Sequence, residues 1–188
     1  GGGRRAGRRG SGAGAGRGGE RARLAAAGAI VTAGDDSGSR LMRMRENLTR
    51  LKLKVSVILG DVLSLPTDTL YDAILLDAPC SATGTIRRHP DLIYLKTPRQ
   101  LNSLADLQEK MLTHASPLLK PGGELIYCTC SLSPAEGERK VFKFLRAHED
   151  VELSPILAEE LGGQGQLVTP AEDFRCLPSR NLGASRGR

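Results

Sequence analysis

The sequence predicts an α/β domain built on a mostly parallel sheet flanked by helices, and two observations carry that prediction. Short apolar runs bounded by turn-forming residues alternate with longer segments whose apolar residues recur at helical spacing. This alternation is typical of parallel strands joined by crossover helices. The chain of 188 residues is also long enough for one domain with a sizeable core.

The first expected elements are a helix, a strand and a second helix. The segment 21–27 suits a helix that stops at Gly28, and the apolar run 29–33 reads as a short buried strand ending near Asp35. The next segment is charged except for apolar residues at helical spacing, which are Leu41, Met44, Leu48 and Leu51. It is therefore expected to form an amphipathic helix that covers one face of the sheet.

Two further strands follow, and each ends in an acidic residue. The run 55–59 is followed by Gly60 and Asp61, and the run 73–76 is followed by Asp77. Asp is common in turns, so a single Asp after a strand does not indicate a binding site. Asp35, Asp61 and Asp77 at successive strand ends suggest one crevice lined by acceptors, which suits ribose hydroxyls, an adenine amino group or a cation.

The second half of the chain contains one long irregular segment, 81–98, and such loops are uncommon unless they are functional. Within it, Arg87, Arg88 and His89 either contact phosphates or form a solvated basic turn. A long amphipathic helix is expected from Pro98 onward. The segments expected after it are a strand at 125–128, a helix opened by Pro134, and weaker strands at 151–153 and 167–168.

Two thiols, Cys80 and Cys130, lie just past expected strands. A thiolate is a good nucleophile toward an electron-poor carbon such as pyrimidine C6. Attack there makes C5 nucleophilic toward a methyl group, and a base must then remove the C5 proton before the thiol leaves. One carboxylate and two thiols could meet those needs. Plainer readings stay open, namely thiols buried as small hydrophobes or half of a metal site at Cys128 and Cys130.

The chain begins with a low-complexity segment, 1–19, made almost entirely of glycine, arginine and alanine. Such a segment cannot bury enough apolar surface to offset its ordering entropy, so a disordered tail or a boundary artefact is expected. An arginine-glycine arm that contacts phosphates is the alternative. Residues 1–23 carry a net charge of +6, which equals that of the whole chain, so the remainder is nearly neutral. A glycine loop needs a preceding strand, and 6–11 does not read as one.

The cysteine content and the hydropathy suggest a compartment. Four cysteines in a chain of this size do not form a disulfide scaffold, and their position at strand ends indicates reduced, intracellular thiols. No apolar run is long enough for a membrane span, and no secretory signal is visible. We therefore expect a cytoplasmic monomer that uses neither a membrane nor a metal.

Several motifs resemble one known enzyme family. They are Asp-Ala-Pro-Cys-Ser-Ala-Thr-Gly at 77–84, Arg-Arg-His-Pro-Asp at 87–91, Lys-Pro-Gly-Gly at 120–123 and Thr-Cys-Ser at 129–131. Together with the sequence of residues 37–51 and with Gly60-Asp61, these motifs closely resemble those of the bacterial RsmB/Sun-type RNA cytosine-C5 methyltransferases. The resemblance covers roughly residues 20–179, and the pair of cysteine motifs is its most specific part.

The resemblance implies a Rossmann-like methyltransferase domain at 20–179 that uses S-adenosylmethionine and acts on ribosomal RNA, with the target cytosine turned out of its stack. By resemblance, Cys130 is the nucleophile, Cys80 resolves the adduct and Asp77 contacts the base. The cofactor residues implied in the same way are Asp35 on the ribose side, Asp61 on the adenine side, Asp77 beside the cofactor, and Gly16, Gly18 and Gly19 in the glycine loop. Arg87, Arg88 and His89 are the candidate RNA contacts.

The sequence also departs from the family pattern. The family loop reads alanine-proline-glycine-glycine-lysine-threonine, whereas residues 16–21 keep only the two glycines and carry Glu20 in place of lysine. We therefore expect a core without its first and last strands, a frayed end at 180–188, and weak cofactor binding. Two rival functions are a non-catalytic RNA-binding relic and an amino-group methyltransferase. The latter favours an acid-proline-proline-aromatic run over Pro79-Cys80-Ser81.

Overall fold

The computed structural model describes residues 9–13, 19–95 and 97–157. The chain divides into two compact units. Unit 1 comprises residues 1–80 and 102–129, and unit 2 comprises residues 81–101 and 130–188. Both cysteine motifs are therefore cut by the boundary, with Cys80 in unit 1 and Cys130 in unit 2.

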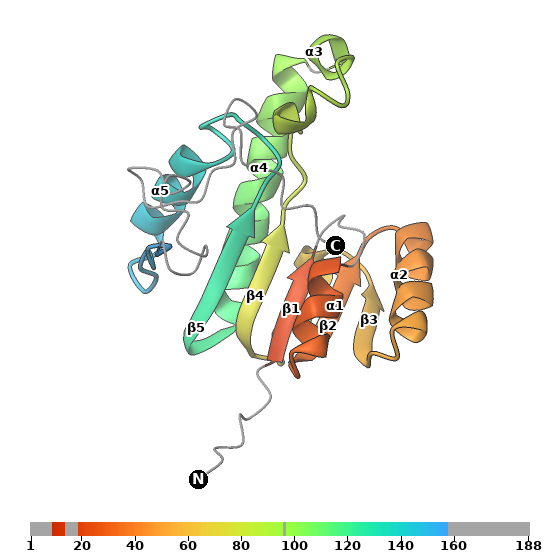
Figure 1. Ribbon diagram of the computed structural model, residues 1–188. Helices are drawn as coiled ribbons and strands as arrows, with labels where there is room; N and C mark the ends of the chain where they lie inside the picture. Colours follow the sequence, from red (N-terminus) through yellow and green to blue (C-terminus); the bar gives the residue numbers. More distant parts are fainter. Residues whose placement is uncertain (1–8, 14–18, 96, 158–188) are drawn as a thin grey trace. The chain divides into compact units, whose positions relative to one another are not determined.

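Unit 1 is organised around a five-stranded sheet of order β3-β2-β1-β4-β5, in which every neighbouring pair is parallel (Figure 1). The strands are β1 (Arg9–Ala13), β2 (Ile30–Asp35), β3 (Val55–Leu59), β4 (Tyr71–Asp77) and β5 (Leu119–Cys128). The predicted α/β class with parallel strands is confirmed. Because all strands are parallel, their carboxyl ends meet at one edge of the sheet.

The helices of unit 1 connect these strands. They are α1 (Gly19–Ala26), α2 (Gly38–Arg50), the 3-10 turns η1 (Val62–Ser64) and η3 (Ser116–Leu118), and α4 (Pro98–Ala115) from Asn102 onward. From β1 the chain steps through α1 to β2 and through α2 to β3, whereas β4 and α4 lead to β5 in the opposite direction. Right-handed crossovers therefore place α1 and α2 on one face and α4 on the other, as Figure 1 shows.

The first strand corrects a sequence-based expectation. Residues 9–13 form β1, which pairs with both β2 and β4 at the centre of the sheet. The expectation that the first strand is missing, and that all of 1–19 is a tail, is therefore wrong for these five residues. Parallel pairing uses main-chain groups, so a stretch without large apolar side chains can still complete a sheet when a partner lies on each side. Residues 1–8 and 14–18 lie outside the described part of the chain.

The side of the sheet carrying α2 owes its packing to the predicted helical pattern. Leu41, Met44 and Leu48 are buried against Ala33 of β2, as the spacing predicts. Ser37 caps this helix by accepting a hydrogen bond from the Arg40 amide. On the opposite face, α4 buries its own apolar stripe together with one polar residue, which are Met111, Leu112, Ala115 and Gln108.

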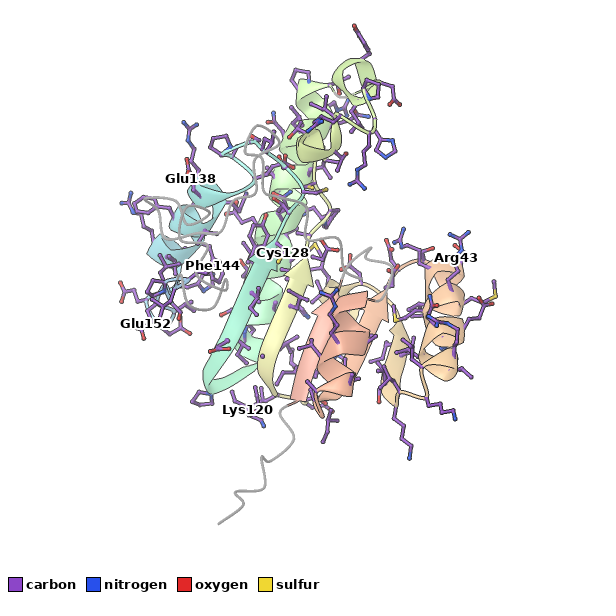
Figure 2. The ribbon with its side chains drawn as sticks, viewed as in Figure 1. Arg43, Lys120, Cys128, Glu138, Phe144 and Glu152 are labelled. Carbon is purple, nitrogen blue, oxygen red and sulfur yellow. The ribbon has the colours of Figure 1, made fainter. Side chains whose placement is uncertain are left out.

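The edge strand β5 begins with an irregularity. Tyr71 of β4 pairs with Leu119, but Ala73 pairs with Glu124, so the run 120–123 bulges out of the ladder. Gly122 adopts a positive φ of 72° there, which favours glycine. Lys120, labelled in Figure 2, forms an ion pair of 3.1 Å with Asp72. The Lys-Pro-Gly-Gly motif at 120–123 is therefore part of β5.

Unit 2 contains η2 (Thr83–Thr85), α3 (Leu92–Leu95), the first residues of α4 and α5 (Glu138–Ala147). Helix α5 starts four residues later than the proline suggested, and its Phe144 ring lies 4.4 Å from the ring of His148. Residues 151–153 do not form the expected strand, and the other weak strand candidate, 167–168, lies outside the described residues. Over the ranges described here, no helix combines the length and apolarity needed to cross a membrane.

Candidate functional site

The aspartates predicted to line a crevice lie along one edge of the unit 1 sheet. Asp35 is the last residue of β2 and Asp77 is the last residue of β4, while Asp61 lies two residues beyond β3. Strand β1 runs between β2 and β4 and parallel to both, so its last residue, Ala13, lies at the same edge. The sheet order therefore brings all three aspartates and the end of β1 to one side of the domain.

Asp35 is held in place by an arginine that the sequence did not single out. Arg40, one turn into α2, donates from Nε to Oδ1 at 2.9 Å and to Oδ2 at 3.1 Å, and its Nη2 lies 2.8 Å from Oδ1. The Ser37 amide adds a bond of 2.8 Å to Oδ1. Burial alone would raise the pKa of Asp35, but these hydrogen bonds and the charge of Arg40 hold it below its ordinary value.

The segment around Asp61 is joined to Asp35 through the backbone. Gly60 donates its amide to the Asp35 carbonyl at 3.0 Å, and this bond continues the pairing of β2 and β3. A Cβ at Gly60 would lie 2.8 Å from the Ser64 hydroxyl oxygen, so a side chain there would force the Ser64 hydroxyl out of its place. Asp61 caps η1 by accepting from the Leu63 amide at 3.2 Å. Its carboxylate is thus fixed near the end of β2.

The turn that carries Cys80 is fixed by a buried amide. Gln108 of α4 is fully buried and donates from Nε2 to the Pro79 carbonyl at 2.9 Å. At the base of the turn, the Ala78 amide donates to the carbonyl of Cys128, the residue that ends β5 (Figure 2). The half-buried Cys80 therefore follows β4 on a turn that is braced by its neighbouring strand and by a helix.

Cys130 is an exposed thiol two residues beyond the end of β5. Its carbonyl accepts the Gly84 amide at 2.9 Å, and both residues belong to unit 2. A Cβ at Gly84 would lie 2.8 Å from that carbonyl oxygen, so only glycine permits this approach. The glycine that ends the Asp77–Gly84 motif thus fixes the backbone of the second cysteine motif.

The other candidate site residues are described only in part. Arg87, Arg88 and His89 are exposed and follow η2, where the His89 amide donates to the Thr85 carbonyl at 3.0 Å. Gly19 is the first residue of α1, whereas Gly16 and Gly18 lie outside the described residues. Cys80, Cys128 and Cys130 form no disulfide. Across the described residues, no cluster of three or more potential ligands is placed to hold a metal ion.

Sequence reasoning missed three polar residues that position this chemistry. Arg40 holds Asp35, Gln108 holds the turn before Cys80, and Glu136 binds the residue after each catalytic cysteine candidate. Arg40 lies within the stretch 37–51 that resembles the family, which was the available signal for it. Gln108 is the one polar residue on the buried stripe of α4. Glu136 lies in a loop and has no local signal.

Replacing Arg40 with methionine should lower the free energy of unfolding by about 1–3 kcal/mol, because a buried carboxylate loses its partner. Asp35 has a depressed pKa when folded, so its contribution is complete at neutral pH and is lost as the pH falls through that value. In the variant, burial should raise the pKa of Asp35 above its unfolded value, so protonation of this group no longer destabilises the fold and the stability difference from wild type should narrow as the pH falls. Urea unfolding between about pH 3 and pH 7 measures this. Arg43→Met, on the same helix, is the control and should leave the acid limb unchanged.

The amino-acid sequence of the chain is similar to those of known methyltransferases. The family model for 16S rRNA methyltransferase RsmB/F matches residues 12–183. Ribosomal RNA small subunit methyltransferase B of Yersinia pseudotuberculosis is 42% identical over 151 residues, which are 79% of this chain and 35% of that protein. The same protein of Yersinia pestis matches equally. The chain therefore spans about a third of the length of these curated relatives.

Solved structures agree on the fold. NSun6 from Pyrococcus horikoshii, in complex with SFG, superposes with a TM-score of 0.70 and 32% identity over 79% of this chain and 38% of that one. A methyltransferase homologue from Pyrococcus horikoshii gives 0.69 and 33% identity over 80% of this chain and 48% of the other. The domain has the Rossmann-like methyltransferase fold. The matched segment begins inside the stretch expected to be a tail, and the chain belongs to the 16S rRNA methyltransferase RsmB/F family.

Proposed function

We propose that this chain is the catalytic part of an RNA cytosine-C5 methyltransferase that uses S-adenosylmethionine and acts on ribosomal RNA. One observation carries the proposal. The neighbouring strands β4 and β5 each lead within three residues to a cysteine that forms no disulfide, and a carboxylate, Asp77, ends the first of them. A thiol nucleophile, a second thiol and an acid are the groups that methylation of C5 through C6 requires.

The described residues fit the cofactor. Asp35 is a buried acceptor at the end of β2, and its Oδ2 accepts the longer of the two hydrogen bonds from the Arg40 Nε, so this oxygen has a lone pair for a further donor such as a ribose hydroxyl. Asp61 is an acceptor at the next strand end. The relative from Pyrococcus horikoshii was solved with the S-adenosylmethionine analogue SFG. When bound, S-adenosylmethionine would supply an activated methyl group at this edge of the sheet.

The proposed chemistry assigns one step to each residue. The Cys130 thiolate adds to C6 of the cytosine, and the electron pair displaced from the ring makes C5 nucleophilic. Asp77, in its acid form, binds the base near N3 and donates a proton there, which neutralises the negative charge that develops on the ring. After C5 is methylated, a base takes up its remaining proton, the electron pair of the C–H bond restores the C5–C6 double bond, and the Cys130 thiolate leaves C6. Cys80 assists this release.

The RNA is expected to meet unit 2 through its exposed basic turn. Arg87, Arg88 and His89 are all exposed, so they are accessible to RNA phosphates. The curated relatives are ribosomal RNA methyltransferases. The target base must leave its stack before a thiol can reach C6. A cytoplasmic location, a monomeric state and a phosphate-binding role for the terminal arginines stay predictions.

The test is methyl transfer by the purified chain from labelled S-adenosylmethionine to small-subunit ribosomal RNA, followed by nucleoside mass spectrometry. Label in 5-methylcytosine supports the proposal, whereas label in an N4-methylated cytosine would assign the amino-group chemistry instead. Transfer below the background of RNA alone, together with no heat of cofactor binding, would reject the enzyme and favour the RNA-binding relic.

A further inference from the structure

A buried carboxylate lies in unit 2 and serves no step of the proposed chemistry. Glu136 is 2% exposed, in the loop before α5. Its Oε1 accepts the Ser81 amide at 2.9 Å. Its Oε2 accepts the Ser131 hydroxyl at 2.6 Å and also a short hydrogen bond from the Ser81 hydroxyl. The carboxylate therefore receives donors from two segments that are about fifty residues apart in the chain.

The direction of the surrounding hydrogen bonds follows from proton counting. A serine or threonine hydroxyl has one proton to donate, and those of Ser81 and Ser131 are donated to Glu136. With the Ser131 proton on Glu136, the Thr83 hydroxyl is the donor in its 3.2 Å contact with the Ser131 oxygen, and the Thr83 oxygen also has a long contact of 3.5 Å with the Ser81 hydroxyl. Thr83 in turn accepts the Leu132 amide at 2.8 Å. The negative charge of Glu136 thus sets the orientation of three hydroxyl groups.

The network holds the residues that directly follow both thiols. Ser81 follows Cys80 and Ser131 follows Cys130, and the two hydroxyl oxygens lie 3.0 Å apart. The Ser131 hydroxyl oxygen also accepts a hydrogen bond from the Ser133 amide at 3.0 Å. The turn that follows Cys130 is therefore held by a bond within the turn as well as by Glu136. The Gly84 amide fixes the Cys130 carbonyl beside the same network. One carboxylate, that of Glu136, therefore fixes the residue that follows each cysteine.

A purely structural role explains this arrangement less well. Burying a carboxylate carries a desolvation cost, and apolar residues of similar volume often stabilise a buried site as well or better. A fully connected polar network does what apolar packing does not, because its bonds have fixed directions and admit one arrangement of the segments they join. The segments joined here are the two that carry the reactive thiols.

We propose that Glu136 is a positioning residue for methyl transfer, which orients Cys80 and Cys130 by fixing Ser81 and Ser131. The proposal rests on the proposed function. Glu136 does not touch the substrate, and its effect is carried by the backbone of the two following serines. Removal of its charge leaves the thiols present but no longer held in the geometry that attack on C6 and release require.

The test compares Glu136→Gln with Glu149→Gln, which makes the same change at an exposed position of unit 2. An amide cannot accept on both sides, so one set of donors loses its partner in Glu136→Gln. We expect kcat to fall about 10- to 100-fold, as when a partner that orients a reacting group is lost, with little change in KM for RNA. Glu149→Gln should match the wild type. A folded Glu136→Gln chain with wild-type kcat overturns the proposal.

A second pair of variants keeps the test decisive if Glu136→Gln does not fold. Thr83→Val keeps the shape but removes the hydroxyl, and Thr83→Ser retains it. We expect Thr83→Val to lower kcat and Thr83→Ser to restore it at equal thermal midpoints. Equal kcat for both contradicts the proposal.

The outcome also separates this proposal from the proposed function. A wild-type chain that transfers no methyl group rejects the function, and Glu136 is then tested through the thiols alone. In that case the alkylation rates of Cys80 and Cys130, relative to that of Cys128, are measured in wild type and Glu136→Gln. Changed ratios support the positioning role, and unchanged ratios overturn it.

Discussion

Replacing Cys130 with alanine is expected to abolish methyl transfer, by roughly 10³-fold or more, the order of loss when a covalent nucleophile is removed. Without the thiol no bond forms to C6, so C5 is never made nucleophilic. The side chain is exposed, and exposed substitutions change the free energy of unfolding by only about 0.5 kcal/mol. The fold should therefore survive. Incorporation of labelled methyl groups into RNA measures the loss.

Two variants make this result specific to the nucleophile. Cys130→Ser keeps a polar group of similar size but a poor nucleophile, and should be as inactive as alanine. Cys128→Ala removes a thiol two residues earlier, at the end of β5, and should cost stability while retaining transfer. Wild-type turnover by Cys130→Ala would place the nucleophile elsewhere, and equal loss in Cys128→Ala would point to damage of the strand end.

The second large effect is expected at Cys80, where substitution should cause the covalent protein–RNA species to accumulate instead of preventing its formation. Once C5 is methylated, the product is still bonded through C6 to Cys130, and release requires loss of the C5 proton. If Cys80 assists that step, Cys80→Ala slows release more than attack, and a protein–RNA species accumulates. This species should survive denaturing gel electrophoresis and depend on S-adenosylmethionine.

The double variant lacking both thiols is the control for this prediction, because the bond to be trapped never forms. A Cys80 that only packs in the turn braced by Gln108 would instead give lower stability and no adduct. Normal turnover of the single variant without any trapped species contradicts the release role. Since the expected change is the appearance of a new species, a partial loss of folding cannot imitate it.

The strand ends were predictable from sequence, and the central strand was not. Apolar runs before Asp35 and Asp77 gave a clear signal because their side chains are buried against helices. Residues 9–13 contain arginine, glycine, serine and alanine, so no side-chain pattern identifies β1. Its pairing with β2 and β4 depends on main-chain groups, which every sequence offers. Residues 9–13 therefore form a strand because of their partners in the folded sheet and not because of their own side chains.

The same distinction applies to the candidate site. Cys80, Cys130 and the three aspartates lie next to recognisable strands, so their positions followed from the pattern. Arg40 and Gln108 lie on predicted helices, but their partners belong to other elements or to a turn. Glu136 has a partner 55 positions away in the chain, and no local spacing connects the two. Contacts of this kind become visible only when the fold brings the segments together.

The central place of β1 has a consequence for how the domain assembles. The pair β2–β3 and the pair β4–β5 are joined within the sheet only through β1. Strand β1 precedes the other four in the chain and can pair with β2 early, but its other edge stays unpaired until Ala73 has emerged to pair with Gly10. Such distant pairings carry a loop-closure cost and slow folding. Until β4 arrives, a nascent chain exposes an open, glycine-rich strand edge that other chains can occupy.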